Sequence, residues 1–163
     1  MVDAVFVEAF SPIEHGPLAD AATLTLTDGR RLAFTTDSFV VQPRHFPGGS
    51  IGHLAVHGTV NDLAVSGAEP MWLSAAFVIE EGFSVAELHE IAAHMAEAAA
   101  LAGVTLVTGD TKVVGKGAAD GLYITTAGVG VMRPDADLGP HNVRPGDIVL
   151  LSGNMADHGM AVM

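Results

Sequence analysis

Residues 57–70 of this chain read HGTVNDLAVSGAEP, which is the pattern of the second half of a helix. Gly67 takes the position after the last turn, where a left-handed backbone is favoured, and Pro70 follows shortly beyond it. Toward the N-terminus, Ser50 is a residue type that caps helices, so we predict one helix from there to about Ser66. Apolar residues lie on nearly every side of it, which predicts a mostly buried helix.

An adjacent amide and carboxylate, Asn61 and Asp62, lie at the edges of one face of this predicted helix. Burying a carboxylate costs free energy unless a cation or a strong hydrogen-bond partner compensates it. Two interpretations are open at this point. Asp62 either binds a cation, or it caps a loop or pairs with one of the few basic residues.

Two further acidic motifs favour the cation. In FTTDSFVV (residues 34–41) and VTGDTKVV (residues 107–114), one carboxylate interrupts an apolar, strand-like run. Magnesium prefers oxygen ligands, so Asp37, Asp62 and Asp110 together predict a divalent cation site. Lys112 lies two positions after Asp110, hence on the same strand face. It is either a phosphate contact or an ion-pair partner of Asp110.

Composition limits the classes of function. The chain has 163 residues, of which 49% are hydrophobic and 16% charged, and its formal net charge is -12. That acidity argues against non-specific nucleic-acid binding, and the low charged content predicts that a subunit or another domain covers part of the surface. The sequence has no cysteine, so it holds no disulfide, thiol nucleophile or zinc–thiolate site. No apolar run approaches about 18 residues and no signal-peptide pattern is present, so we expect a cytoplasmic protein without membrane association.

The remaining pattern predicts a two-layer α+β (α/β) domain, with a mixed sheet and helices on one side. Asp28 and Gly29 form a hairpin signal, and Ser84 with Glu87 forms a capping box for a helix that Gly103 ends. We expect strands at 23–27 and 31–41, a helix at 50–66, a strand at 71–80, a helix from 84 to about 102, and strands at 104–114 (broken at Gly109-Asp110) and 122–132.

Domain boundaries follow from composition. Residues 1–133 form one predicted domain, and residues 134–146 contain proline and glycine without a clear period, which indicates a linker. The strand-like GDIVLLSG at residues 146–153 follows, and the sequence stops soon after it, so we expect residues 147–163 to be the start of a truncated second domain. His53 and His57 have a spacing that can hold a metal, but no third ligand is evident, which disfavours a transition-metal site.

Taken together, several motifs resemble one family. The segments TTDSFVV, FPGG, GTVNDLAVSGAEP, EEG, VTGDTKVV, GLYITTAGVG, RPGD and SGNMADHG are similar to the N-terminal domain of the HypE family of hydrogenase maturation factors. That family belongs with aminoimidazole ribonucleotide synthetase, selenophosphate synthetase and thiamine-phosphate kinase. The resemblance implies that residues 1–133 are an ATP-binding and dimerisation domain whose strands close a barrel across a homodimer.

The resemblance also implies a site for ATP and Mg²⁺. The matching positions are Asp37, Asp62 and Asp110 for the metal; Asn61, Asp62, Asp110, Thr111 and Lys112 for ATP; and Asp62 and Lys112 for catalysis. His158, in an Asp-His-Gly motif, is a further candidate near the nucleotide.

HypE-like proteins use ATP to dehydrate a carbamoyl group on their own C-terminal cysteine, which gives a thiocyanate. The cyano group then reaches the iron of [NiFe]-hydrogenase. Implied partners are a HypF-type carbamoyltransferase and HypC- and HypD-type scaffold proteins. This chain has no cysteine and lacks most of the second domain and the family's glycine-rich N-terminal segment, so we expect no dehydration by this polypeptide and weak or no ATP binding.

Two alternatives stay open. The first is another ATP enzyme of the same superfamily, making selenophosphate or phosphorylating thiamine phosphate. An Arg-x-Cys tail in the remainder of the protein would favour HypE instead. The second is a dimerisation module with no activity of its own, which calorimetry with Mg-ATP would separate from an intact site.

Overall fold

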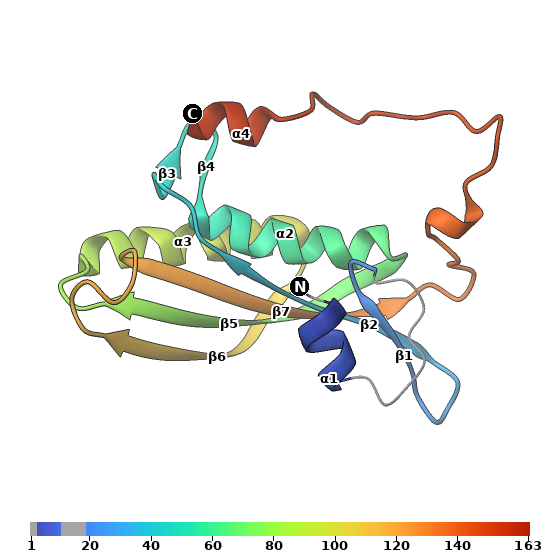
Figure 1. The fold of residues 1–163 in the computed structure, drawn as a ribbon, viewed down its shortest axis with the longest axis horizontal. Coiled ribbons are helices and arrows are strands. Elements are labelled where there is room, and N and C mark those ends of the chain that lie inside the picture. Colours follow the sequence, from blue (N-terminus) through green and yellow to red (C-terminus); the bar gives the residue numbers. More distant parts are fainter. Residues whose placement is uncertain (1–2, 11–18) are drawn as a thin grey trace.

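The computed structural model describes residues 3–10 and 19–163, and its centre is a five-stranded sheet covered on one face by two helices (Figure 1). The strands of this sheet are β1 (Ala22–Thr25), β2 (Arg31–Phe39), β5 (Ala68–Glu80), β6 (Thr105–Val114) and β7 (Leu122–Met132), and the covering helices are α2 (Ile51–Val65) and α3 (Val85–Ala102). Smaller elements are η1 (Asp3–Val7), α1 (Glu8–Phe10), the β3–β4 hairpin (His45–Phe46 and Gly49–Ser50), η2 (Pro140–Asn142) and α4 (Asp157–Val162).

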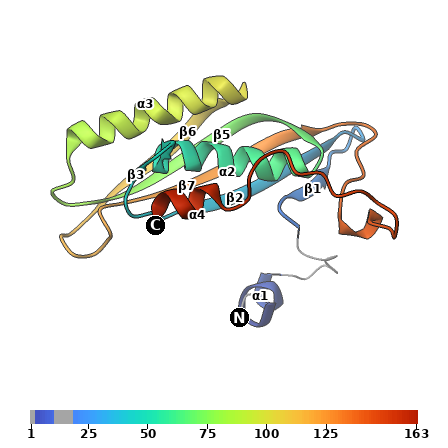
Figure 2. The same ribbon diagram turned by 90° about the horizontal axis from the view of Figure 1, so that it is seen from above.

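The sheet is mixed, as predicted. Its strand order is β1-β2-β7-β5-β6, and β5 runs parallel to β6 while the other neighbours are antiparallel. The parallel pair requires a crossover, and α3 supplies it. Figure 2, seen from above, shows α2 and α3 lying side by side on the same side of the sheet. The mixed two-layer prediction is therefore confirmed.

Local signals placed the turns and helix ends correctly. The β1–β2 hairpin turns at Gly29 (φ +86°). Gly67 (φ +86°) follows the C-cap of α2, and its N–H donates to the carbonyl of Ala64. Gly103 adopts φ +69° after α3. Each glycine takes a left-handed conformation that other residues rarely adopt.

The predicted capping box forms only in part, because Ser84 makes the expected contact and the Glu87 side chain does not. Ser84 accepts the Glu87 N–H at 3.3 Å, but the Glu87 carboxylate pairs with Arg44 (Nε–Oε1 2.7 Å). That bond to Arg44, more than any other contact, lowers the pKa of Glu87.

Ser50 does not cap α2 with its side chain. Its hydroxyl lies 3.0 Å from Nδ1 of both His53 and His94. The rings of these histidines stack with centroids 4.6 Å apart. The hydroxyl thus joins the start of α2 to the middle of α3.

Two strand predictions were wrong in their limits. β5 begins at Ala68, so Pro70 lies inside the strand, at a register shift where its missing N–H is tolerated. β6 is continuous through Gly109 and Asp110, and its irregularity falls earlier, opposite the Leu73/Ser74 step.

The strand expected within residues 147–153 is absent from the structure. Ile148, Val149 and Leu150 are 83–94% exposed, and no strand among the described residues pairs with them. A strand needs a neighbour to satisfy its backbone hydrogen bonds, so the apolar pattern alone does not produce one. The sequence also predicts that Pro12, Gly16 and Pro17 end the N-terminal helix-like segment, and these three residues lie outside the described residues.

The core lies between the helices and the sheet, and it fixes the position of α2. The Thr126 hydroxyl on β7 donates its one proton to the Ala55 carbonyl at 2.9 Å. The Thr59 hydroxyl oxygen lies 2.5 Å from the Thr126 hydroxyl oxygen, and Thr59 must therefore be the donor of that second bond. A Cβ on Gly128 would lie 2.8 Å from Thr59 Cγ2, so glycine there permits this close approach. The largest fully buried apolar side chains are Ile51, Leu63, Leu73, Ile91, Leu122, Ile124 and Val56.

The prediction that α2 is mostly buried was too broad. Asn61, Ala64 and Val65 are exposed, because the sheet and α3 cover only part of the helix surface. The candidate site residues of α2, Asn61 and Asp62, are therefore exposed and partly exposed.

Candidate functional site

The site is centred on Asp62, near the end of α2. Its Oδ2 accepts a hydrogen bond from the buried Thr35 hydroxyl of β2 at 3.1 Å. Burial raises the pKa of Asp62, and the nearby carboxylates of Asp37 and Asp20 raise it further, against the lowering effect of the Thr35 bond. A bound cation would favour the ionised form of Asp62, so this environment suits a cation.

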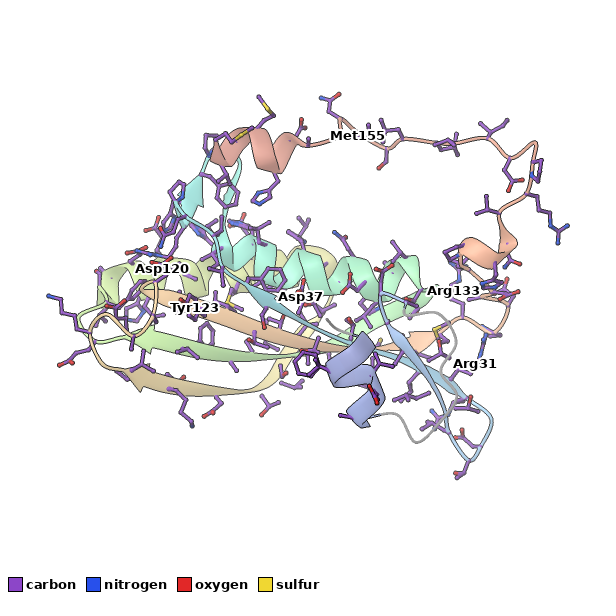
Figure 3. All side chains as sticks on the ribbon, in the orientation of Figure 1. Arg31, Asp37, Asp120, Tyr123, Arg133 and Met155 are labelled. Atoms are coloured by element: carbon purple, nitrogen blue, oxygen red, sulfur yellow. The ribbon has the colours of Figure 1, made fainter. Side chains whose placement is uncertain are left out.

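Asp37 lies on β2 beside α2 (Figure 3). Its register partner is Thr126, which is buried beneath the helices, so Asp37 is on the helix-covered face. A Cβ on Gly58 of α2 would lie 3.8 Å from Asp37 Oδ2 and 2.8 Å from the Phe39 ring. A glycine at this position of α2 therefore lets the helix approach β2 closely.

Asp110 lies elsewhere. It pairs with Ala76 of β5, which alternates with the buried Ala75, so Asp110 is on the face away from the helices. β6 is also three strand spacings from β2, or about 14 Å at about 4.8 Å per spacing. The expectation that Asp37, Asp62 and Asp110 converge within one chain is wrong.

Lys112 and Thr111 accompany Asp110. The Lys112 ammonium lies 2.8 Å from Asp110 Oδ2, on an exposed surface. This bond is the main cause of the lowered pKa of Asp110, with a smaller effect from the Thr111 N–H. Within one chain, Lys112 is thus an ion-pair partner of Asp110, the second of the two interpretations left open.

Sequence reasoning missed Asp20, which had no clear pattern around it. Its backbone carbonyl accepts the Thr35 hydroxyl at 2.7 Å, and its carboxylate acts on Asp62. The hairpin register pairs Ala22 with Phe34, so extending that register by two residues would have placed Asp20 beside Thr35 and Thr36.

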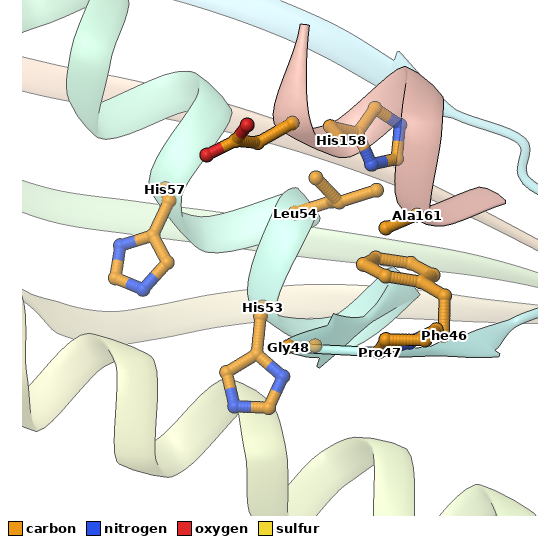
Figure 4. A pocket seen from close by; sticks show the side chains of 10 residues that line it. Phe46, Pro47, Gly48, His53, Leu54, His57, His158 and Ala161 are labelled. Carbon is orange, nitrogen blue, oxygen red and sulfur yellow. The ribbon is translucent and has the colours of Figure 1, made fainter. Parts of the chain in front are cut away.

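A separate cavity of about 420 Å³ lies at the other end of α2, between the β3–β4 hairpin and α4 (Figure 4). His158, from the Asp-His-Gly motif, lines it and meets the Phe46 ring edge-on at 5.2 Å. Figure 4 shows the rings of His53 and His57 directed toward α3, away from His158. The remaining lining residues are Pro47, Gly48, Gly49, Leu54, Asp157 and Ala161.

Neither region contains a preformed metal centre. Over residues 3–10 and 19–163, no group of three or more histidine, aspartate or glutamate side chains has an arrangement that could hold a metal ion. Burial, followed by the nearby charge of His94, lowers the pKa of His53. In the same part of the chain, none of the helices has the length and apolar character required to span a bilayer.

The sequence and the fold agree with one protein family. Residues 18–132 match the family described as AIR synthase related protein, N-terminal domain, and the chain belongs to that family. Within it, the chain is similar to carbamoyl dehydratase HypE of Rhodobacter capsulatus, at 53% identity over 100% of this chain and 48% of the relative.

Two solved structures extend the comparison. One, described as a HypE-HypF complex, superposes with a TM-score of 0.89 at 52% identity, over 99% of this chain and 52% of that one. The other, described as HypE in complex with ATP, has a TM-score of 0.78 at 48% identity, over 99% and 48% of the two chains. The chain thus spans about half the length of the curated relatives it matches.

Proposed function

We propose that this chain is the N-terminal, ATP-binding part of a carbamoyl dehydratase in [NiFe]-hydrogenase maturation, acting in the cytoplasm. The observation that carries the proposal is the 53% identity to a carbamoyl dehydratase HypE over the whole chain. Residues 1–133 are the proposed domain, 134–146 the linker, and 147–163 the start of a second domain. The full activity requires a cysteine, which this sequence does not contain.

Asp37 and Asp62 fit a divalent cation, because both offer hard oxygen ligands, and because burial and the nearby Asp37 carboxylate raise the pKa of Asp62. We propose that they hold Mg²⁺, which when bound offsets the charge of the ATP phosphates. Asn61, exposed on the same helix, is a proposed ATP contact. In this proposal, Asp62 has the catalytic role of keeping the metallated phosphates in one orientation.

We infer that Asp110, Thr111 and Lys112 serve the same nucleotide from a second copy of the chain. Within a single chain these three residues lie far from Asp62, because β6 is distant from β2 in the sheet and Asp110 lies on the uncovered face. In that arrangement Lys112 exchanges Asp110 for a phosphate oxygen, which is the catalytic role proposed for it.

The uncovered face supports a homodimer. Phe34, Val129 and Trp72 form one row across β2, β7 and β5 on the side opposite the helices. Phe34 and Trp72 are 42% and 45% exposed. Exposed aromatic rows of this kind mark interfaces, and we propose that two such faces meet in a barrel across a two-fold axis.

We predict that Trp72→Lys dissociates the dimer. Placing an ammonium in an apolar interface should raise the dimer dissociation constant at least about 30-fold, since an aromatic anchor typically contributes about 2 kcal/mol or more. Sedimentation equilibrium measures it. Val85→Lys, on the 68% exposed surface of α3, is the matched control and should leave association unchanged. A monomeric wild type at tens of micromolar would contradict the dimer.

Calorimetry with Mg-ATP tests the nucleotide site. We expect weak, Mg²⁺-dependent binding by the 163-residue chain and no carbamoyl dehydration, because the acceptor cysteine is missing. Dehydration by this polypeptide alone would contradict the proposal. The proposed partners are a HypF-type carbamoyltransferase, as in the HypE-HypF complex, and HypC- and HypD-type scaffolds.

The separation of Asp110 from Asp62 favours one second candidate, a dimerisation module without nucleotide binding. Heat release with Mg-ATP that disappears on adding a chelator would exclude this candidate. Dimerisation without any such heat would support it.

A further inference from the structure

Thr35 occupies a central position between the elements that carry the acidic side chains. It is 6% exposed, on the helix-covered face of β2. Its hydroxyl oxygen lies 2.7 Å from the Asp20 carbonyl oxygen and 3.1 Å from Asp62 Oδ2. One side chain therefore joins the segment before β1 to the carboxylate on α2.

The hydroxyl has one proton and faces two acceptors. The Asp20 carbonyl and the ionised Asp62 carboxylate are both acceptors without a proton to donate. The Thr35 hydroxyl proton is therefore shared between these two acceptors or alternates between them. Threonine is stiff at χ1, which limits how far the hydroxyl oxygen can move from this position. Among the described residues, no other hydrogen bond to the Asp62 carboxylate is seen, so Thr35 alone fixes its Oδ2.

We propose that Thr35 is a positioning residue for cation binding: its hydroxyl holds Asp62 Oδ2 so that the other carboxylate oxygen meets a divalent cation in one orientation. The inference rests on the proposed function, because it concerns the same Asp37–Asp62 pair. Thr35 does not touch the cation. It acts by restricting the carboxylate, as partners of metal ligands commonly do.

The neighbouring Thr36 provides a matched control. Its hydroxyl donates to the Thr126 carbonyl at 3.0 Å on the same strand, away from Asp62. Thr36→Val and Thr35→Val each remove one hydroxyl and keep the side-chain shape. Only Thr35→Val releases the Asp62 carboxylate.

The experiment titrates the ¹⁵N-labelled 163-residue chain with Mn²⁺ alone and follows paramagnetic broadening of amides near Asp37 and Asp62. Thr35→Val is expected to need about tenfold more Mn²⁺ than the wild type for equal broadening, the usual loss for a partner of a metal ligand. Thr35→Ser, which retains the hydroxyl, and Thr36→Val should stay close to the wild type.

Equal Mn²⁺ dependence in Thr35→Val and the wild type would overturn the positioning role and leave the cation site standing. The positioning role would also be overturned if Thr35→Ser lost as much Mn²⁺ affinity as Thr35→Val, since a purely structural role of Thr35 predicts that pattern. If Thr35→Val does not fold, Thr35→Ala provides the same deletion with a smaller side chain. A wild type without broadening at these amides would overturn the Asp37–Asp62 cation pair itself, and this inference with it.

Discussion

Asp62→Asn is expected to abolish the response to divalent cations while making the fold more stable at neutral pH. Losing partners of metal ligands already costs about 10–100-fold in affinity, so removal of a direct ligand should cost at least about 100-fold. The Mn²⁺ titration measures this loss. A variant that keeps wild-type Mn²⁺ dependence would show that Asp62 is not a ligand.

The stability gain follows from the direction of the pKa shift. Burial and the carboxylates of Asp37 and Asp20 raise the pKa of Asp62, so the folded state holds this proton more tightly than the unfolded state. Stability therefore falls as pH rises through the interval between the ordinary pKa and the folded one, and the cost is fully present above that interval. Asparagine avoids this cost and still accepts the Thr35 hydrogen bond.

The measurement is thermal unfolding as a function of pH, in the absence of divalent cations. Asp62→Asn should melt higher than the wild type at pH 7. The difference in melting temperature should shrink as the pH falls from the raised pKa of Asp62 toward the ordinary aspartate value of about 4, and it should be absent below that value. Asp28→Asn is the control. Hydrogen bonds from the backbone and side chain of Arg30 lower the pKa of Asp28, so its substitution should give no gain at pH 7.

Gly52→Ala is expected to destabilise the fold by about 1–3 kcal/mol, the usual cost of overpacking a core. An added Cβ would lie 2.6 Å from the Ile91 carbonyl oxygen of α3 and 3.2 Å from Met95 Cγ. The backbone carbonyl cannot rotate away, so α2 and α3 must separate. At this chain length the melting temperature should fall by about 2–12 °C.

Gly115→Ala is the matched control, because nothing lies within 4 Å of its added Cβ and its backbone is not left-handed. It should change stability by no more than about 0.5 kcal/mol. If Gly52→Ala were equally neutral, the helices would be able to move apart without cost, and the close packing of α2 on α3 would not matter for stability.

The sequence predicted features that depend on local chemistry. Gly29, Gly67 and Gly103 were placed correctly, because each turn or helix end needs a conformation that glycine supplies. Features set by neighbouring strands were not predictable. Pro70 lies within β5 because a register shift accommodates it, and the residues from Ile148 onward form no strand because none of the described strands pairs with them.

The same distinction between local features and features set by strand order applies to the candidate site. Asp37 and Asp62 were correctly expected to lie near each other, since β2 and α2 are close in sequence and pack directly. Asp110 was misplaced, because the face it occupies depends on the order of the strands and on the β5–β6 register. Thr35 was passed over beside the more conspicuous Asp37, although its buried hydroxyl joins two segments.

The serine shared by two imidazoles has a consequence for proton placement. Ser50 can donate its single hydroxyl proton to Nδ1 of either His53 or His94, so the other ring must donate its own Nδ1–H to the serine oxygen. While both rings are neutral they are therefore opposite tautomers, and neither can exchange its form unless the other does so as well. Two helices distant in sequence thus share one constraint on where their protons lie. The ¹⁵N chemical shifts of the ring nitrogens would show it, because His53 and His94 would give the patterns of two different tautomers.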